Sequence, residues 1–343
     1  KVGVLSDSFN CLGTLSEDLI SGDVPNVRII KEYSYCESEN NPPTDEGRAM
    51  IQLIHDIAPG AELLFHTATE SPVGFAVGIQ RLVAEGANII VDDIGWLTMP
   101  MFQEGIISQA VNEAAAAGVT YFSAAGNAGR LSYENDFVAK TTDEGDIAHD
   151  FGAAAGGESD LYQKITIPKG VEFTIILQWD DPAEMANSTI KAKTDLDLVV
   201  LDSTLSKVIA TGQDSNIGHD PVEIIRLTTE DIGEDLAEAN LYIRKSAGDN
   251  PNNIKYVIFS NAKPEVITQD LASVKLLRYH ESFFYGKHFH NATDIDFETL
   301  IEEPVESESE SESESESDSE SEVTVDPSRR IIVSGEDGQV VIL

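Results

Sequence analysis

The first 137 residues alternate between apolar runs and segments with helical spacing, and this alternation restricts the fold more than any other feature. The predicted strands are 2–6, 62–67, 88–93 and 119–124, and the predicted helices are 45–56, 73–85 and 102–117. Strands that alternate regularly with helices form a parallel sheet with helices on both faces. The carboxyl ends of the strands then share one edge, where open α/β sheets place their ligand sites.

Polar side chains follow two of these strands. The run Val2–Phe9 reaches Asp7 where its apolar part ends, and the run 118–125 is followed by Gly126-Asn127-Ala128-Gly129. An asparagine amide held at the sheet edge can donate a hydrogen bond to a developing oxyanion. Removing one such donor typically costs roughly 3–4 kcal/mol of transition-state stabilisation. The alternative for Asn127 is an ordinary Asn-Gly turn.

The helix predicted at 45–56 begins with Glu46-Gly47, and Thr44 or Asp45 can serve as its N-cap. Helical spacing predicts one buried face, which also carries Glu46, made of Ala49, Met50, Leu53 and Ile57. A partly desolvated carboxylate has a raised pKa and suits general-base chemistry on the acid side of neutral. Asp7 would lie across the strand ends and orient Glu46 or share a proton with it. Glu46 could instead be an ordinary first-turn acid that favours the helix dipole.

These segments, in this order, resemble the subtilisin and sedolisin families of serine peptidases. Glu46-Gly47 stands where subtilisins have their catalytic His-Gly pair and sedolisins a glutamate, and a similar Ala-Pro-Gly-Ala turn follows at 58–61. The resemblance covers residues 1–137 and implies a subtilisin-like α/β fold that hydrolyses peptide or protein substrates. It makes Glu46 the general base, Asp7 its orienting acid and Asn127 the oxyanion donor. It also places Asp93 and Gly95 at the substrate cleft, where a solvated strand-end acid is the alternative for Asp93.

The sequence departs from both families in three places. Met50 stands where sedolisins carry a second acid, and Asn127 where they have an aspartate, so the arrangement is a hybrid. No Gly-Thr-Ser-x-Ala segment supplies a nucleophile. We therefore expect this chain, which begins directly on a strand, to be an incomplete copy that is inactive alone. A non-catalytic binding or scaffold protein is the first alternative. A periplasmic-type small-molecule binder is the second, and the β-runs of 164–259 argue against it.

Residues 138–268 change to short β-type runs, which predict an antiparallel β-sandwich. This domain is similar to accessory modules of secreted peptidases, and the resemblance implies that it is inserted before the missing serine helix. It contains an oxygen-rich set of side chains, Asp195, Asp197, Asp214, Asn216 and Asp220. Hard oxygen ligands suit Ca²⁺. The spacing does not match an EF-hand loop, however, and this mismatch favours the alternative that these are ordinary acidic turn residues. We assign no metal ligand and no certain cofactor.

The rest of the chain divides into three segments. Residues 269–300 resemble, weakly, a segment that returns to the parallel sheet of the peptidase fold. His288 and His290 in this segment could bind zinc only with a third ligand, and none is evident. Residues 301–323 are a low-complexity Ser-Glu tract predicted to be disordered. Residues 324–343 predict a β-hairpin that resembles part of a WD-repeat blade.

Charge and cysteine content limit the partners and the compartment. The net charge of −39 excludes nucleic acid and anionic membranes as partners, and no apolar run is long enough to span a bilayer. Cys11 and Cys36 are the only cysteines, and they form either a disulfide, as in a secreted protein, or two thiols, as in a cytosolic one. The compartment stays open, with an extracellular one favoured.

Overall fold

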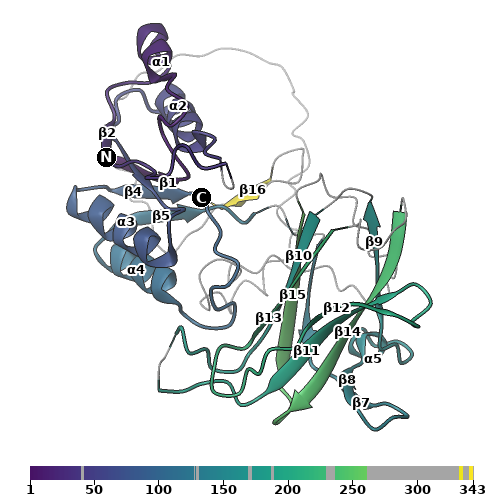
Figure 1. Cartoon of the computed structure of the whole chain (residues 1–343). Helices are drawn as coiled ribbons and strands as arrows, with labels where there is room; N and C mark the ends of the chain where they lie inside the picture. The colour runs from purple at the N-terminus through teal and green to yellow at the C-terminus, as the bar shows by residue number, and fades with distance from the viewer. Residues whose placement is uncertain are drawn as a thin grey trace, which may run out of the picture.

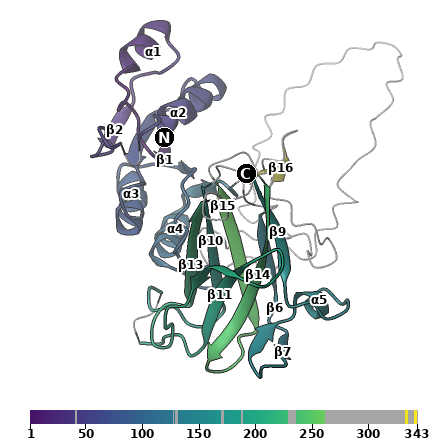
Figure 2. The ribbon, with the colours of Figure 1, turned by 45° about the vertical axis from the view of Figure 1, so that its right-hand side comes forward.

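The computed structural model describes residues 1–39, 42–126, 128, 131–168, 172–186, 189–228, 236–260, 332–334 and 340–342. These residues form an α/β body and a β-rich body that lie side by side (Figures 1 and 2). Among them, no helix has the length and apolar character needed to cross a membrane.

The α/β body contains a five-stranded parallel sheet in the order β2-β3-β1-β4-β5. Its elements are β1 (Val2–Ser6), α1 (Leu15–Ser21), β2 (Arg28–Lys31), α2 (Glu46–Ile57), β3 (Leu63–Thr67), α3 (Pro72–Ala84), β4 (Ile89–Asp92), α4 (Ile106–Ala116) and β5 (Thr120–Ser123). The predicted parallel sheet is confirmed. Helix α1 and strand β2 were not predicted, because α1 buries none of its residues and β2 is a short edge strand.

Helices cover both faces of this sheet, as the alternation predicts. On one face Leu5 and Leu64 belong to a core cluster that also contains buried residues of α3 and α4. On the other face Val4 and Phe65 pack with Ile51 of α2. Successive side chains of a strand point to opposite faces, so β1 and β3 contribute to both layers.

The predicted buried face of α2 is wrong for three of its four residues, and only Met50 of the four packs against the core. Leu53 and Ile57 are 65% and 87% exposed, and Ala49 is also exposed, while the buried residues are Gly47, Arg48 and Ile51. Gly47 packs so closely on Phe65 that an added Cβ would lie 2.3 Å from the ring. The Arg48 guanidinium is buried because it forms ion pairs with Asp18 and Asp45. These contacts rotate the helix relative to the apolar pattern.

The β-rich body is an antiparallel two-sheet structure with a shared core, as predicted. Its elements are β6 (Ser132–Asp136), β7 (Ala139–Thr141), β8 (Ile147–His149), α5 (Phe151–Ala154), β9 (Gln163–Pro168), β10 (Glu172–Trp179), β11 (Asp195–Asp202), β12 (Val208–Gly212), β13 (Val222–Thr228), β14 (Leu236–Ala247) and β15 (Asn253–Ser260). One sheet has the order β13-β10-β15-β6, the other β12-β11-β14-β8-β7, with β9 also on β14. Strand β6 pairs with β15, so this body begins before residue 138.

Strand β10 is buried on both of its faces, which accounts for its unbroken apolar run. Ile175 and Leu177 enter the core between the two sheets, while Ile176 and Gln178 face the α/β body. The Gln178 side chain is 3% exposed, accepts a hydrogen bond from Met101 N at 2.9 Å and donates one to Met99 O at 3.0 Å. The amide of Gln178 therefore joins the two bodies, because it pairs with one backbone N–H and one backbone carbonyl of the α/β body, as a neighbouring strand would.

Replacing Gln178 should weaken this junction. In the Gln178→Leu variant the Met101 N–H and the Met99 carbonyl lose their partners while buried, which we expect to cost about 2 kcal/mol. Urea unfolding monitored by circular dichroism measures the loss. The matched control is Gln80→Leu on the exposed side of α3, where a change below about 0.5 kcal/mol is expected. Equal effects of the two substitutions would contradict the role of Gln178.

Strands β16 (Ile332–Ser334) and β17 (Val340–Ile342) pair antiparallel, in agreement with the predicted hairpin. Its likeness to a WD-repeat blade stays a prediction. Residues 269–300, with His288 and His290, and the Ser-Glu tract 301–323 lie outside the described residues, so the inserted position of the β-rich body also stays a prediction.

Candidate functional site

The candidate site lies at the carboxyl end of β1, the central strand of the parallel sheet. Strand β1 lies between β3 and β4, so the chain crosses from one side of β1 to the other between these two strands. Such a reversal of strand order is where open α/β sheets bind their ligands. Asp7 follows β1, Asp93 follows β4, and Glu46 begins α2, so three acids meet at this end of the sheet.

Glu46 is partly buried and has a polar partner on β1. Ser6 Oγ donates a hydrogen bond to Glu46 Oε2 at 3.1 Å. Burial raises the pKa of the Glu46 carboxyl above 4.5, the charge of Asp93 raises it further, and the Asp7 charge adds to this, while the Ser6 hydrogen bond opposes the shift. A carboxyl of this kind can accept a proton at mildly acidic pH.

Asp7 holds Glu46 through the backbone. Its Oδ1 accepts a hydrogen bond from Glu46 N at 3.0 Å, and its Oδ2 accepts from Thr44 N at 2.6 Å and Thr44 Oγ1 at 2.8 Å. Asp7 therefore caps the N-terminus of α2, a position that favours a carboxylate. Asp45 instead uses its carboxylate to accept from Cys11 N and Leu12 N, so neither predicted residue caps the helix with its side chain.

Asp93 and Asp92 point to different environments. The Asp93 side chain is exposed at the sheet edge, yet the surrounding protein raises the pKa of its carboxyl by partial desolvation. Asp92 is 2% exposed and accepts a hydrogen bond from Ser123 Oγ at 2.9 Å, which ties β4 to β5. Sequence reasoning placed Asp93 at the cleft without foreseeing its effect on Glu46. Gly95 is exposed in the loop after β4. Asn127 lies outside the described residues.

A disulfide closes the connection between β1 and α2. Cys11 and Cys36 are bonded, with their Cα atoms 5.0 Å apart, which decides the alternative that the sequence left open. The same segment is held by Glu32, whose carboxylate accepts hydrogen bonds from Phe9 N and Asn10 N. The backbone that precedes Glu46 is therefore fixed by a covalent bond and by carboxylate contacts.

Removing the disulfide should destabilise this connection moderately. The Cys11→Ser/Cys36→Ser variant loses the cross-link of a 25-residue separation. We expect a loss of about 2 kcal/mol, at the low end for disulfides because the hydrogen bonds of Glu32 and Asp45 remain. Urea unfolding with and without a reducing agent measures it, and the reducing agent should not affect the variant. An oxidised wild-type chain no more stable than the reduced one would contradict the prediction.

The oxygen-rich set of the β-rich body is only partly assembled. Asp195 Oδ1 accepts from Asn216 N at 3.2 Å, and Asp220 Oδ1 accepts from Met185 N at 2.8 Å. Asp197 is instead paired with Arg244. Within the part of the chain that the structure describes, no three His, Cys, Asp or Glu side chains are placed to hold a metal ion.

Comparison with known proteins gives structural matches with low scores. No family model and no curated protein matches the chain. A Pseudomonas sedolisin, a serine-carboxyl proteinase, matches with a TM-score of 0.26 and 19% identity over 38% of this chain and 39% of that chain. The VP2 subviral particle of infectious bursal disease virus matches with a TM-score of 0.20 and 13% identity, over 41% of this chain and 30% of that one. The chain thus spans about two fifths of the sedolisin it partly resembles, and scores this low assign no function.

Proposed function

We propose that the α/β body is the acid–base part of a serine endopeptidase site of the subtilisin/sedolisin kind, with Glu46 as general base. The observation that supports this most is the environment of Glu46 at the carboxyl end of the central strand. Its carboxyl has a raised pKa, a hydroxyl partner in Ser6 and a second acid, Asp93, close enough to influence it.

These features match what hydrolysis of a peptide bond requires. A serine hydroxyl is a weak nucleophile and needs a base within hydrogen-bond reach. Asp7, which binds the Glu46 backbone, would keep that base in position. Asn127 is proposed as the oxyanion donor, and Asp93 and Gly95 as contacts to the bound peptide. The Cys11–Cys36 disulfide supports an extracellular location, because disulfides persist in oxidising compartments.

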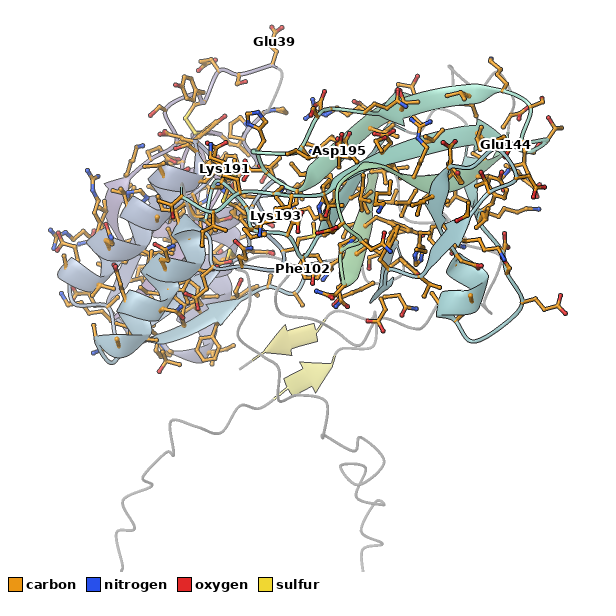
Figure 3. The ribbon with its side chains drawn as sticks, turned by 90° about the horizontal axis from the view of Figure 1, so that it is seen from below. Glu39, Phe102, Glu144, Lys191, Lys193 and Asp195 are labelled. Atoms are coloured by element: carbon orange, nitrogen blue, oxygen red, sulfur yellow. A yellow bond between two sulfur atoms is a disulfide. The ribbon has the colours of Figure 1, made fainter. Side chains whose placement is uncertain are left out.

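The pKa of Glu46 tests the acid–base part directly. A carbon-detected NMR titration should give a value above 4.5 for its carboxyl. In the Asp93→Asn variant that pKa should fall, because a neighbouring negative charge is removed. Glu39, an exposed residue of the connection before α2 (Figure 3), supplies the control Glu39→Gln, which should leave the titration unchanged. An ordinary pKa for Glu46 would remove the support for a general base.

Peptidase activity is tested with mixed fluorogenic peptides between about pH 3 and 8. Because the sequence holds no Gly-Thr-Ser-x-Ala segment, we expect no turnover by this chain alone. A polypeptide extended by such a segment should cleave peptides, and Glu46→Gln should lower its kcat by at least about 100-fold. Activity that survives the substitution would rule out Glu46 as the base.

The absence of that segment also favours a second candidate, a non-catalytic protein that binds peptides and does not cleave them. It predicts that peptides bind near Asp93 and that Glu46→Gln leaves the affinity and its pH dependence unchanged. The endopeptidase proposal predicts that the pH dependence of binding follows the titration of Glu46 and disappears in Glu46→Gln.

A further inference from the structure

A hollow of about 620 Å³ lies on the outer face of the second sheet of the β-rich body. Strands β7, β11, β12 and β14 contribute to its lining. Glu144, one of the lining residues, lies at the end of this body remote from the α/β body (Figure 3). The hollow is therefore separate from the candidate site at Glu46, and its size is within the usual range for ligand pockets.

Aliphatic and aromatic side chains form part of the floor of the hollow. Val199 of β11 lies directly opposite Thr211 of β12 and Tyr242 of β14, so these residues form one row across three strands. Tyr162 stacks on Tyr242 with ring centroids 5.5 Å apart and an interplanar angle of 29°. Val208, on the same lining, is 53% exposed, so the groove offers apolar surface to a ligand.

The rim of the hollow is acidic. Asp143, Glu144 and Asp146 stand exposed around the turn between β7 and β8. None of the ion pairs found among the described residues involves these carboxylates. Two cations, Lys140 and Arg244, line the same hollow, and the Arg244 guanidinium is paired with Asp197 and also feels the charge of Asp146, so the three rim acids outnumber the two cations of the lining. Burial raises the pKa of the Tyr242 hydroxyl, and the Asp146 charge raises it further, which places that carboxylate near the tyrosines.

We infer that this groove, here called the acidic groove, binds an extended peptide of another protein that carries an arginine or lysine between apolar side chains. A cation over a tyrosine face gains cation–π attraction, and a guanidinium can pair with the carboxylates of the rim. The flanking apolar side chains cover Val208 and Leu205, which line the groove and are 53% and 42% exposed. A second copy of this chain is a poor occupant, because each copy carries a net charge of −39. The inference does not depend on the peptidase proposal.

A synthetic peptide with a Leu-Arg-Leu centre, labelled with a fluorophore, tests the inference on the full chain by fluorescence anisotropy. We expect binding that weakens as salt is added, and at least about tenfold weaker binding of the Leu-Gln-Leu and Leu-Glu-Leu peptides. The variant Asp143→Asn/Glu144→Gln/Asp146→Asn should bind the arginine peptide at least about tenfold more weakly. The matched control, Glu37→Gln/Glu39→Gln/Asp56→Asn, neutralises three exposed acids of the α/β body and should keep the wild-type affinity.

Two further measurements identify the groove itself. Tyr162→Ala should weaken binding about threefold or more, because one tyrosine face is lost. A benzophenone-labelled peptide should cross-link to residues 139–162 or 199–213, a result that needs no variant. Undetectable binding at about 1 mM peptide, equal binding of the glutamate peptide, or cross-links confined to the α/β body would each overturn the inference.

Discussion

At about pH 8.5 the Glu223→Gln variant is expected to be more stable than the wild-type chain, by up to about 5 kcal/mol. Glu223 is 1% exposed and lies at the start of β13 in line with Ile225 and Leu227, which enter the core between the two sheets. Burial, followed by the charges of Asp214 and Asp197, raises the pKa of its carboxyl to about 8, although a hydrogen bond from the Asp214 backbone opposes the shift. The folded chain therefore retains a proton on Glu223 at neutral pH.

The sign of the effect follows from the two protonation states. With a pKa of about 8 in the folded chain and 4.5 as the unfolded reference, Glu223 contributes full stability below about pH 4.5. That contribution is lost as the pH rises from 4.5 to 8, and each unit of difference corresponds to about 1.4 kcal/mol. Glutamine does not ionise, so the variant avoids the loss. Its advantage should therefore vanish near pH 4.

Urea unfolding at about pH 4 and 8.5 measures the difference between the two proteins. The control is Glu238→Gln, because Glu238 is exposed and its ion pair is with Lys164, whose side chain is 42% exposed. Its substitution should change stability by less than about 0.5 kcal/mol at both pH values. A gain for Glu223→Gln that is the same at both values would point to packing, and would contradict the ionisation argument.

Glu223 also illustrates what the sequence contained but the prediction missed. Residues 223–227 belong to the stretch in which the sequence predicts short β-type runs, and alternation along a strand places Glu223 on the same face as Ile225 and Leu227. An acid on the inward face of a strand is a signal of a buried carboxyl, which was available without coordinates. Its neighbours were not available, because Gly212 and Asn216 approach from other strands and loops.

The sheet architecture was predictable, because strand and helix periodicity is local. The details of the candidate site could not be predicted, because they depend on contacts between residues that are distant in sequence. The buried face of α2 depends on Phe65 of β3 and on the partners of Arg48, which are distant in sequence. Asp7 was predicted to act on the Glu46 carboxyl, and its charge helps to raise the pKa of that carboxyl. Its hydrogen bonds, however, come from backbone N–H groups at the start of α2 and from the Thr44 hydroxyl. The influence of Asp93 on Glu46 likewise depends on the positions of β1 and β4 at the centre of the sheet.

The second large effect concerns His149, which should make the β-rich body lose stability in acid. His149 is 0% exposed, its Nδ1 accepts a hydrogen bond from Val138 N at 3.2 Å, and its Nε2 lies 2.8 Å from Tyr133 Oη. Burial lowers the pKa of the imidazole to about 4, and the Asp150 charge only partly opposes this. A histidine that is neutral in the folded chain contributes its full stabilisation above pH 6.5. As the pH falls from 6.5 to 4, the folded chain loses up to about 3 kcal/mol of stability.

Together His149 and Glu223 predict an unusual pH profile for the β-rich body. Between about pH 4.5 and 6.5, unfolding takes up one proton at His149 and releases one from Glu223, so the two contributions cancel and stability is level. Below this range stability falls because of His149, together with acids such as Asp150 and Asp202 whose carboxyl pKa is lowered in the folded chain. Above this range stability falls because of Glu223. In Glu223→Gln the level region disappears, and stability should rise steadily from about pH 4 to 6.5 and then stay constant.

Trp179 makes this profile measurable, because it is 0% exposed in the core between the two sheets. In a Trp96→Phe background it is the only tryptophan, so its fluorescence reports unfolding of the β-rich body alone. Urea titrations at intervals from about pH 3.5 to 9 should show the level region in this background and its loss when Glu223→Gln is added. Parallel profiles of the two proteins would mean that Glu223 is ionised in the folded chain at neutral pH. A profile with no acid loss below 4.5 would mean that His149 accepts a proton without unfolding the sheets around it.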